Sequence, residues 1–329
     1  MKTEQGPSRG AVTLHGQPLF HKERKRWDMK RKRDILVSVL FLAPAMILLI
    51  GLIIYPVVNT VNLSFRSWNG VYGMPKEFVG LDNFRDVLTN TNFWEALLHC
   101  VYFLVGGFCI LMPLAFILAL IITSKMRGRK LFKTAFFMPI MLSATAVALI
   151  WIYMLNPQYG AVNKILELVG LGSLTKDWLA TPGVNVWSVV LVNEWMYAGY
   201  NMLIFAAGLV AIPSDLYEAA EIDGCTHWKR LRYVTLPLMK NSFKIFSVLC
   251  VTGCLKTFDL IWAMTKGGPN RSSEMPATLI YNEAFSYRQF GRSSAIGVIL
   301  LIIGLLLSLI MNWLFRDRDT LQEKGVKKS

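Results

Sequence analysis

Charged residues are scarce in this chain of 329 residues: only 17% are Asp, Glu, Lys or Arg, whereas 54% are apolar or aromatic. A soluble domain carries about 25% charged residues, so this chain has too few of them to cover a surface exposed to water. The composition therefore predicts an integral membrane protein. The net charge of +14 does not indicate a nucleic-acid partner, because basic residues beside membrane spans normally report topology.

Residues for catalysis, redox chemistry or metal binding are also missing from the sequence. The five cysteines form no Cys-x-x-Cys pair, and no histidines lie at zinc-finger spacing. A phosphate-binding loop would end in Gly-Lys-Ser/Thr, and the nearest segment, 170–176, lacks that ending. No paired carboxylates and no Ser/His/Asp set stand out. We expect a protein that is not an enzyme and has no metal or cofactor of its own.

Long apolar runs, by contrast, are abundant. A bilayer core of about 30 Å needs roughly 20 helical residues to cross it. Six runs meet this length, and together they predict an all-α membrane protein with six transmembrane helices between a basic tail at 1–34 and a second tail at 316–329. The predicted spans are residues 35–58, 97–123, 134–155, 186–210, 245–263 and 294–315.

The distribution of basic residues predicts the orientation. With the N-terminus in the cytoplasm, the cytoplasmic segments contain 25 Lys and Arg residues and the outer segments contain 9. Because cytoplasmic loops are enriched in Lys and Arg, we expect both termini to be cytoplasmic. The tract from Lys22 to Arg33 would then fix the first span and contact anionic lipid head groups.

The loop at 212–242, between the fourth and fifth predicted spans, has strong helix signals. Ser214 is a suitable N-cap and Asp215 lies in the first turn, where the helix dipole favours a negative charge. Gly224 can end this helix in the left-handed conformation, and Thr226 can cap a second short helix. The sequence thus predicts a cytoplasmic helical elbow, which suits either a groove on a partner protein or the membrane surface.

The same loop contains a spaced pattern of acidic, small and proline residues. It reads Glu218-Ala219-Ala220, then Asp223-Gly224, then nine residues, then Val234-Thr235-Leu236-Pro237. This pattern resembles the EAA signature of permease subunits of bacterial binding-protein-dependent ABC importers. The chain departs from it in two places: Val234 stands where isoleucine is usual, and Cys225 replaces the usual alanine after the glycine.

Other segments resemble the carbohydrate-importing branch of this family, namely the first permease subunit of maltose and glycerol-3-phosphate type. These segments are 80–84, 137–139, 206–213 and 258–269. The resemblance implies the type I ABC importer permease fold in the bacterial cytoplasmic membrane. It also implies that the elbow couples transport to ATP hydrolysis through Glu218, Ala219, Ala220, Asp223, Gly224, Leu236 and Pro237.

The partners that the resemblance implies are a second, related permease in a heterodimer, two cytoplasmic ATPase subunits that bind ATP and Mg²⁺, and an extracytoplasmic solute-binding protein. The implied cargo is a sugar or oligosaccharide. Two alternatives stay open: the same importer class with a peptide, amino acid or anion as cargo, and a stand-alone secondary transporter. A secondary transporter would often show internal repeats with interrupted helices, and the sequence shows no such repeat.

Three charged residues lie within the predicted spans, where such residues are rare and often functional. Glu194 and Lys256 are at similar predicted depth, so we expect them to form an ion pair, with Asp259 as a competing partner of Lys256 three residues away on one helix face. Alternatively, these charges line a water-filled path for sugar. The nearby candidates for that path are Trp195, Tyr200, Asn201 and Trp262, although aromatic residues near membrane boundaries are often interfacial anchors.

Overall fold

The computed structural model describes residues 37–124 and 126–315, which are almost entirely helical. The chain divides into two units at Asn59. The predicted tails at 1–34 and 316–329 lie outside the described residues, and so does the basic tract expected to contact lipid. In the first unit, helix begins at residue 37 and continues through η1 (Ile50–Ile54, a π-helical turn) into α2 (Tyr55–Ser64), whose residues 60–64 belong to the second unit.

The second unit contains one small antiparallel sheet and a series of helices. The sheet pairs β1 (Arg66–Ser67) with β2 (Glu77–Phe78), with Arg66 opposite Phe78. The helices in chain order are α3 (Asp82–Thr89), α4 (Thr91–Gly106), η2 (Gly107–Leu111), α5 (Met112–Thr123), α6 (Arg129–Met141), α7 (Ala144–Met154), α8 (Ala161–Leu168), η3 (Gly172–Leu174), α9 (Val184–Val210), α10 (Ser214–Ile222), α11 (His227–Arg230), η4 (Leu231–Thr235), α12 (Leu236–Leu238), α13 (Lys240–Cys254), α14 (Asp259–Met264), α15 (Pro276–Tyr281), η5 (Asn282–Ser286) and α16 (Phe290–Leu314).

Several predicted spans correspond to long helices. Within the described residues, Val37–Ser64, Thr91–Thr123 and Phe290–Leu314 are each long and apolar enough to cross a membrane. They match the first, second and sixth predicted spans. The fourth matches α9, whose 27 residues extend about 40 Å. Three bent helix pairs, one of which is α9 with Ser214–Ile222, raise the number of candidate spans within the described residues to as many as six when each pair is counted as one span.

The third predicted span, 134–155, is not one continuous helix in the structure. Residues 134–155 are divided between α6 and α7, which meet at an angle of 100°. Pro139 removes a backbone donor near the end of α6. Leu142 is extended, and the Ser143 hydroxyl caps the new helix by accepting a hydrogen bond from the Ala146 N–H at 3.2 Å. Neither half, at roughly 20 Å or less, would cross the bilayer core alone.

The fifth predicted span is also interrupted. Helix α13 ends at Cys254 and α14 begins at Asp259, so the intervening residues are not helical. Lys256 therefore lies in the break, and it does not share a helix with Asp259 as the sequence predicted. The apolar content of this run does not indicate a break. The two charged residues within the run do mark its position, since Lys256 lies in the break and Asp259 is the first residue of α14.

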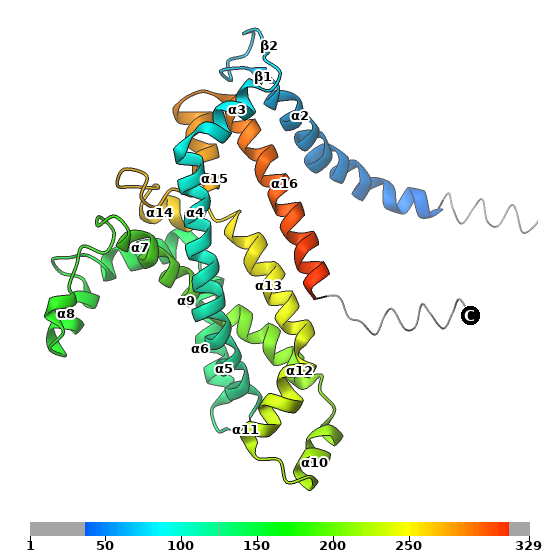
Figure 1. Cartoon of the computed structure of the whole chain (residues 1–329), viewed down its shortest axis with the longest axis vertical. Helices are drawn as coiled ribbons and strands as arrows, with labels where there is room; N and C mark the ends of the chain where they lie inside the picture. Colours follow the sequence, from blue (N-terminus) through cyan, green and yellow to red (C-terminus); the bar gives the residue numbers. More distant parts are fainter. Residues whose placement is uncertain (1–36, 125, 316–329) are drawn as a thin grey trace, which may run out of the picture. The chain divides into compact units, whose positions relative to one another are not determined.

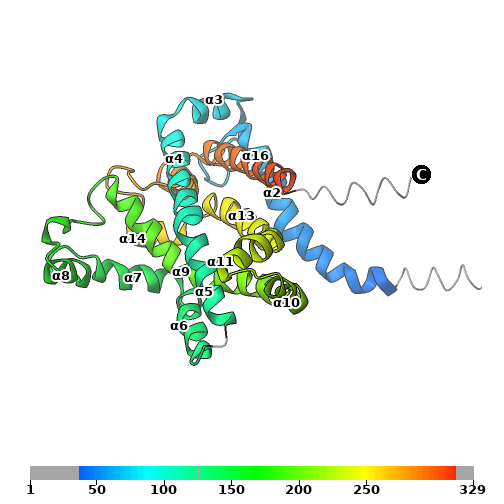
Figure 2. The same cartoon turned by 60° about the horizontal axis from the view of Figure 1, so that its bottom comes forward.

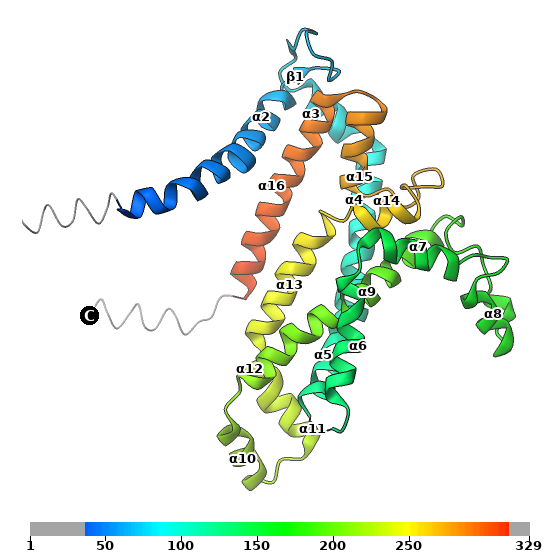
Figure 3. The ribbon, with the colours of Figure 1, turned by 180° about the vertical axis from the view of Figure 1, so that it is seen from behind.

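Helix α9 is the central element of the second unit, and buried residues occur along its whole length. It packs against α4, α5, α6, α13 and α14 (Figures 1 and 2). Glycines allow two of these contacts. A Cβ atom on Gly199 would collide with the backbone of α6 at Phe136, and one on Gly106 of α4 would collide with Val190 of α9. Figures 1 and 3 show α10 and α11 at one end of this unit and α3 at the other.

The segment that connects α14 to α15 is held by hydrogen bonds that are buried or partly buried. The side chain of Asn185, at the start of α9, donates to the carbonyl oxygen of Gly268 at 2.8 Å. The Nδ1 atom of His99, on α4, lies 2.7 Å from the carbonyl oxygen of Glu274. Asn282 donates to the Glu274 carboxylate at 2.7 Å. These contacts tie the segment to α4, α9 and η5, and so they position α14 beside α9.

Candidate functional site

A cavity of about 280 Å³ lies beside the middle of α9. Its walls come from α9, from α13 and the break that follows it, from the start of α14, from α4 and η2, and from the first residue of α7. Both interrupted spans therefore border it. Non-helical backbone at membrane depth is tolerated where it is buried in protein or lines a water-filled cavity, and this arrangement provides such a place. Five of the seven predicted path residues line the cavity: Glu194, Tyr200, Asn201, Lys256 and Asp259.

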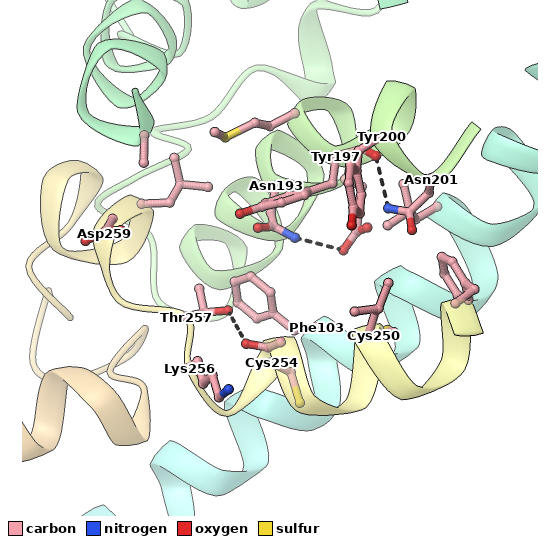
Figure 4. Close-up of a pocket in the computed structure, with 18 residues that line it drawn as sticks. Phe103, Asn193, Tyr197, Tyr200, Asn201, Cys250, Cys254, Lys256, Thr257 and Asp259 are labelled. Carbon is pink, nitrogen blue, oxygen red and sulfur yellow. Dashed lines mark hydrogen bonds between the residues drawn. The ribbon is translucent and has the colours of Figure 1, made fainter. Parts of the chain in front are cut away.

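The α9 wall carries amides, phenols and a carboxylate. Asn193, Tyr197 and Asn201 are spaced four residues apart, and such residues lie on one helix face. The Asn201 side chain donates to the Tyr197 carbonyl oxygen at 3.0 Å (Figure 4). Sequence reasoning missed Asn193 and Tyr197, although their helical spacing from Asn201 could have identified both.

The opposite wall comes from α13 and its break. Cys250, Cys254, Lys256 and Thr257 face α9 across the cavity (Figure 4). The Thr257 hydroxyl donates to the Gly253 carbonyl oxygen at 3.2 Å, a backbone group at the end of α13. The break thus brings polar side chains to a wall that a continuous apolar helix would have made hydrophobic.

Trp195 and Trp262 are not among the residues that line this cavity. Trp195 follows Glu194 directly, so it points about 100° away around α9, and its ring lies 5.5 Å from that of Trp151. The Trp262 ring stacks on Phe258 at 5.5 Å and lies 4.5 Å from Tyr281. Both tryptophans belong to aromatic packing beside the cavity.

The predicted ion pair between Glu194 and Lys256 is absent: within residues 37–124 and 126–315, no salt bridge joins Glu194, Lys256 and Asp259 in any combination. Glu194 is only 3% exposed. Its Oε1 atom accepts a long hydrogen bond of 3.4 Å from Asn193 (Figure 4), while its buried Oε2 atom has no hydrogen-bond partner among the described residues. Lys256 and Asp259 are exposed at separate points of the wall.

This geometry predicts that Glu194→Gln and Lys256→Gln have independent effects. Because no salt bridge joins them, removing both charges is not expected to recover the loss of either single variant, whereas a buried pair would be rescued in part by removing both charges. Transport rates of the two single variants and the double variant measure this. Glu167→Gln, on exposed α8, is the matched control. If the double variant transported better than either single variant, the prediction of an ion pair between Glu194 and Lys256 would be supported after all.

The elbow is the second candidate site, and its main features are as predicted. Gly224 has a φ of +73°. The N–H of Cys225 donates to the Ala220 carbonyl at 2.9 Å and the N–H of Gly224 donates to that of Glu221 at 3.0 Å, which together form a Schellman motif. Thr226 caps the next helix by accepting from the Lys229 N–H at 3.4 Å. Two short helical arms therefore meet at Gly224.

The arms are also held together by side chains. The Tyr217 hydroxyl of α10 lies 3.2 Å from the Thr235 hydroxyl, and the Arg230 guanidinium lies over the Tyr217 ring. Apolar side chains remain exposed on the elbow, including Ile222 at 86% and Trp228 at 72%. These two side chains are available to a partner that would bind the elbow.

Most predicted coupling residues lie on the surface of the elbow: Glu218, Ala219, Asp223, Gly224 and Pro237 are exposed, and Leu236 is half-buried. Two details differ from the prediction. Ser214 is the first helical residue and its side chain caps nothing, because Pro213 occupies the N-cap. Ala220, named among the coupling residues, is buried within this chain, so its small side chain packs internally.

The sequence as a whole can be compared with known proteins. A profile of the family described as "Binding-protein-dependent transport system inner membrane component" matches residues 111–319. The chain belongs to this family. The matched region of the permease contains α9, both cavity walls and the elbow.

Individual relatives and a solved structure agree with this assignment. The permease is 33% identical over 299 residues to a probable ABC transporter permease protein of Pyrococcus horikoshii, covering 88% of this chain and 100% of that one. It is 30% identical over 280 residues to a probable starch degradation products transport system permease protein of Thermoanaerobacterium thermosulfurigenes, covering 85% and 94%. Its fold matches a chain of a bacterial ABC transporter that imports the acidic polysaccharide alginate, with a TM-score of 0.75, 23% identity, and coverage of 88% and 98%.

Proposed function

We propose that this permease moves a sugar or oligosaccharide, delivered by an extracytoplasmic binding protein, through the cavity beside α9. The observation that supports this most directly is the lining itself: Asn193, Glu194, Tyr197, Tyr200 and Asn201 offer amide, carboxylate and phenol groups within an apolar unit. Such groups suit the hydroxyls of a saccharide, and aromatic rings suit its apolar faces. The relative from T. thermosulfurigenes, named for starch degradation products, supports the same class of cargo.

In this proposal the energy comes from ATP and Mg²⁺ bound by two separate cytoplasmic ATPase subunits, and a second, related permease completes the pathway. The exposed apolar side chains of the elbow, Ile222 and Trp228, supply a docking surface for an ATPase groove. Glu218, exposed on the first arm, would bind a cation of that subunit. Among the described residues, no cluster of three or more His, Cys, Asp and Glu side chains is arranged to hold a metal ion.

The test is ATP hydrolysis by the complete importer in proteoliposomes, with its binding protein loaded with different solutes. We expect saccharide-loaded binding protein to stimulate hydrolysis and to drive uptake of the same saccharide. Stimulation only by a peptide, an amino acid or an inorganic anion would contradict the proposed cargo. Uptake by this chain without the ATPase subunits would contradict the proposed energy source.

The proposed orientation places both termini and the elbow in the cytoplasm, with the α8 region outside. A cysteine introduced at Ser173, in η3, is expected to react with a membrane-impermeant maleimide added to intact cells. A cysteine at Ser214, at the start of α10, is expected to react only after the membrane is permeabilised. Labelling is read against the background of the unmodified chain. The opposite pattern would reverse the orientation and remove the elbow from the ATPase side.

A further inference from the structure

Helix α8 and the turn that follows it expose a row of large aliphatic side chains. Ile165, Leu168 and Val169 are spaced by three and four residues, so they share one face of the helix, and they are 56%, 85% and 63% exposed. Leu171 and Leu174 extend the row into η3 and are also exposed. We call these five residues the α8 stripe. Apolar residues exposed singly are ordinary, whereas a group that shares one face marks an interaction surface.

The opposite face of α8 is fixed to the rest of the second unit, so the stripe is held outward. Val162 packs against the core around α9. Asn163 is buried, accepts a hydrogen bond from the Trp178 indole at 2.7 Å and donates to the Lys176 carbonyl oxygen at 3.0 Å. The Ser188 hydroxyl of α9 donates to the Trp178 carbonyl oxygen at 2.9 Å. Because these contacts fix the rotation of α8, the helix cannot turn the stripe inward.

The position of α8 favours the bilayer as the partner of the stripe. The helix connects α7, the second half of a bent candidate span, with α9, and only residues 155–160 and 169–183 separate it from these two elements. Figures 1 and 3 show α8 to the side of the other helices of the second unit, at a level between α3 at one end and α10 at the other. Since this unit crosses the membrane between those two ends, a helix at that level lies within the bilayer or at its boundary.

The composition of the stripe also fits lipid better than protein. Its five members are all Ile, Leu or Val, and it contains none of the aromatic, Met or Arg residues that are enriched at protein interfaces. Tyr153 and Tyr159, which precede α8, are exposed, and tyrosines concentrate where acyl chains meet head groups. Lys164 and Glu167 are exposed beside the stripe, and such long side chains can extend into the head-group layer.

We propose that α8 is an interfacial helix whose stripe is covered by phospholipid of the outer leaflet, at the boundary between acyl chains and head groups. Amphipathic helices lie in this layer with their apolar face toward the acyl chains. The apolar side chains supply the binding, because the charges of Lys164 and Glu167 beside them are opposite in sign. Lipid contact at this helix does not depend on the identity of the cargo, and only the choice of leaflet follows from the proposed orientation.

Spin labelling of the complete importer in proteoliposomes distinguishes lipid, water and protein around α8. A nitroxide is attached to Lys164→Cys, Ile165→Cys, Glu167→Cys and Leu168→Cys in turn, and the signal from the native cysteines of the unmodified chain is subtracted. Collision rates are measured with oxygen, which concentrates in acyl chains, and with a water-soluble nickel chelate. We expect the ratio of the oxygen rate to the nickel rate to be at least fivefold higher at the two stripe positions than at the two charged positions.

The other possible covers of the stripe give different results. A fast nickel rate at Leu168→Cys would mean that water covers the stripe, and slow rates with both reagents would mean that a protein subunit covers it. Either result overturns the proposal. All four labelled positions are exposed in this chain, so these variants are expected to assemble, and the two stripe positions test the proposal independently.

A second measurement tests whether the apolar side chains themselves hold the helix in the lipid. Leu168→Gln combined with Val169→Gln is expected to lower the ratio at Ile165→Cys at least threefold, because the binding of an interfacial helix scales with its buried apolar area. Lys164→Gln is the matched control, and it is expected to leave that ratio unchanged. An unchanged ratio after the loss of both apolar side chains overturns the proposal.

Discussion

Gly199→Ala is expected to destabilise the permease by about 3 kcal/mol, at the upper end of the usual cost of overpacking. Gly199 lies in α9 where the backbone of α6 crosses it, and a Cβ atom would collide with the carbonyl group of Phe136 and the Cα atom of Phe137. These are backbone atoms, which cannot move aside as the end of a flexible side chain can. The helices must separate, and the packing of α6 on the central helix weakens.

The measurement is the thermal unfolding midpoint and the yield of the purified permease in detergent. The matched control is Gly304→Ala on α16, where the new Cβ atom would meet only Leu255 Cδ1 at an ordinary 3.7 Å. Because alanine is a better helix former than glycine by about 1 kcal/mol, the control is expected to be neutral or slightly stabilising. Equal behaviour of the two variants would show that the close approach of α6 and α9 is not needed.

Hydropathy predicted the continuous spans well because a helix satisfies the backbone hydrogen bonds of an apolar run inside the bilayer. Helix α9 begins only two residues before the predicted start at 186, and α16 begins four residues before the predicted start at 294. The interrupted spans were not predictable in this way. The run at 134–155 stays apolar across the break at Leu142 and Ser143, since a bend changes backbone direction without changing composition.

The candidate cavity was partly predictable for a related reason. The rarity of charge in apolar runs singled out Glu194, Lys256 and Asp259, and all three line the cavity. Which aromatic residues join them depends on the helix face, and neighbours in sequence point in different directions. Trp195 therefore does not line the cavity, although Glu194 beside it does. The prediction of the ion pair was wrong because Lys256 lies in non-helical backbone after Cys254. Its predicted depth was counted along a straight helix, and that count does not include the change of direction at this break.

The elbow was predicted in more detail than any other element, because caps and turns depend on individual residues. Gly224 adopts the left-handed conformation and Thr226 caps the next arm as expected. Both features depend on the conformational and hydrogen-bonding preferences of single residues, which can be read from the sequence. Ser214 is the exception: the preceding Pro213 takes the N-cap position, and the boundary of the helix moves by one residue.

Gly224→Val is expected to abolish the coupling of ATP hydrolysis to the saccharide-loaded binding protein, reducing stimulated hydrolysis at least tenfold. At a φ of +73°, a β-branched side chain is strongly disfavoured, so the Schellman motif opens and the second arm leaves its angle to α10. The exposed Trp228 on the second arm then changes its position relative to Ile222 on the first, which would disturb the proposed docking of an ATPase subunit on the elbow. Glu218→Lys is expected to act in the same direction by reversing the charge on the first arm.

Helix α8 provides a control that separates the effect of backbone strain itself from the effect of placing that strain in the elbow. It ends in the same motif: Gly170 has a φ of +79°, its N–H donates to the Glu167 carbonyl at 3.1 Å, and the N–H of Leu171 donates to that of Leu166 at 2.7 Å. Gly170→Val therefore suffers the same backbone conflict at a different site. We expect this variant to keep stimulated hydrolysis, and all three variants to assemble with their partners on size-exclusion chromatography. Normal coupling in Gly224→Val and Glu218→Lys would show that the ATPase does not dock on the elbow, whereas equal loss in Gly170→Val would attribute the effect to strain alone.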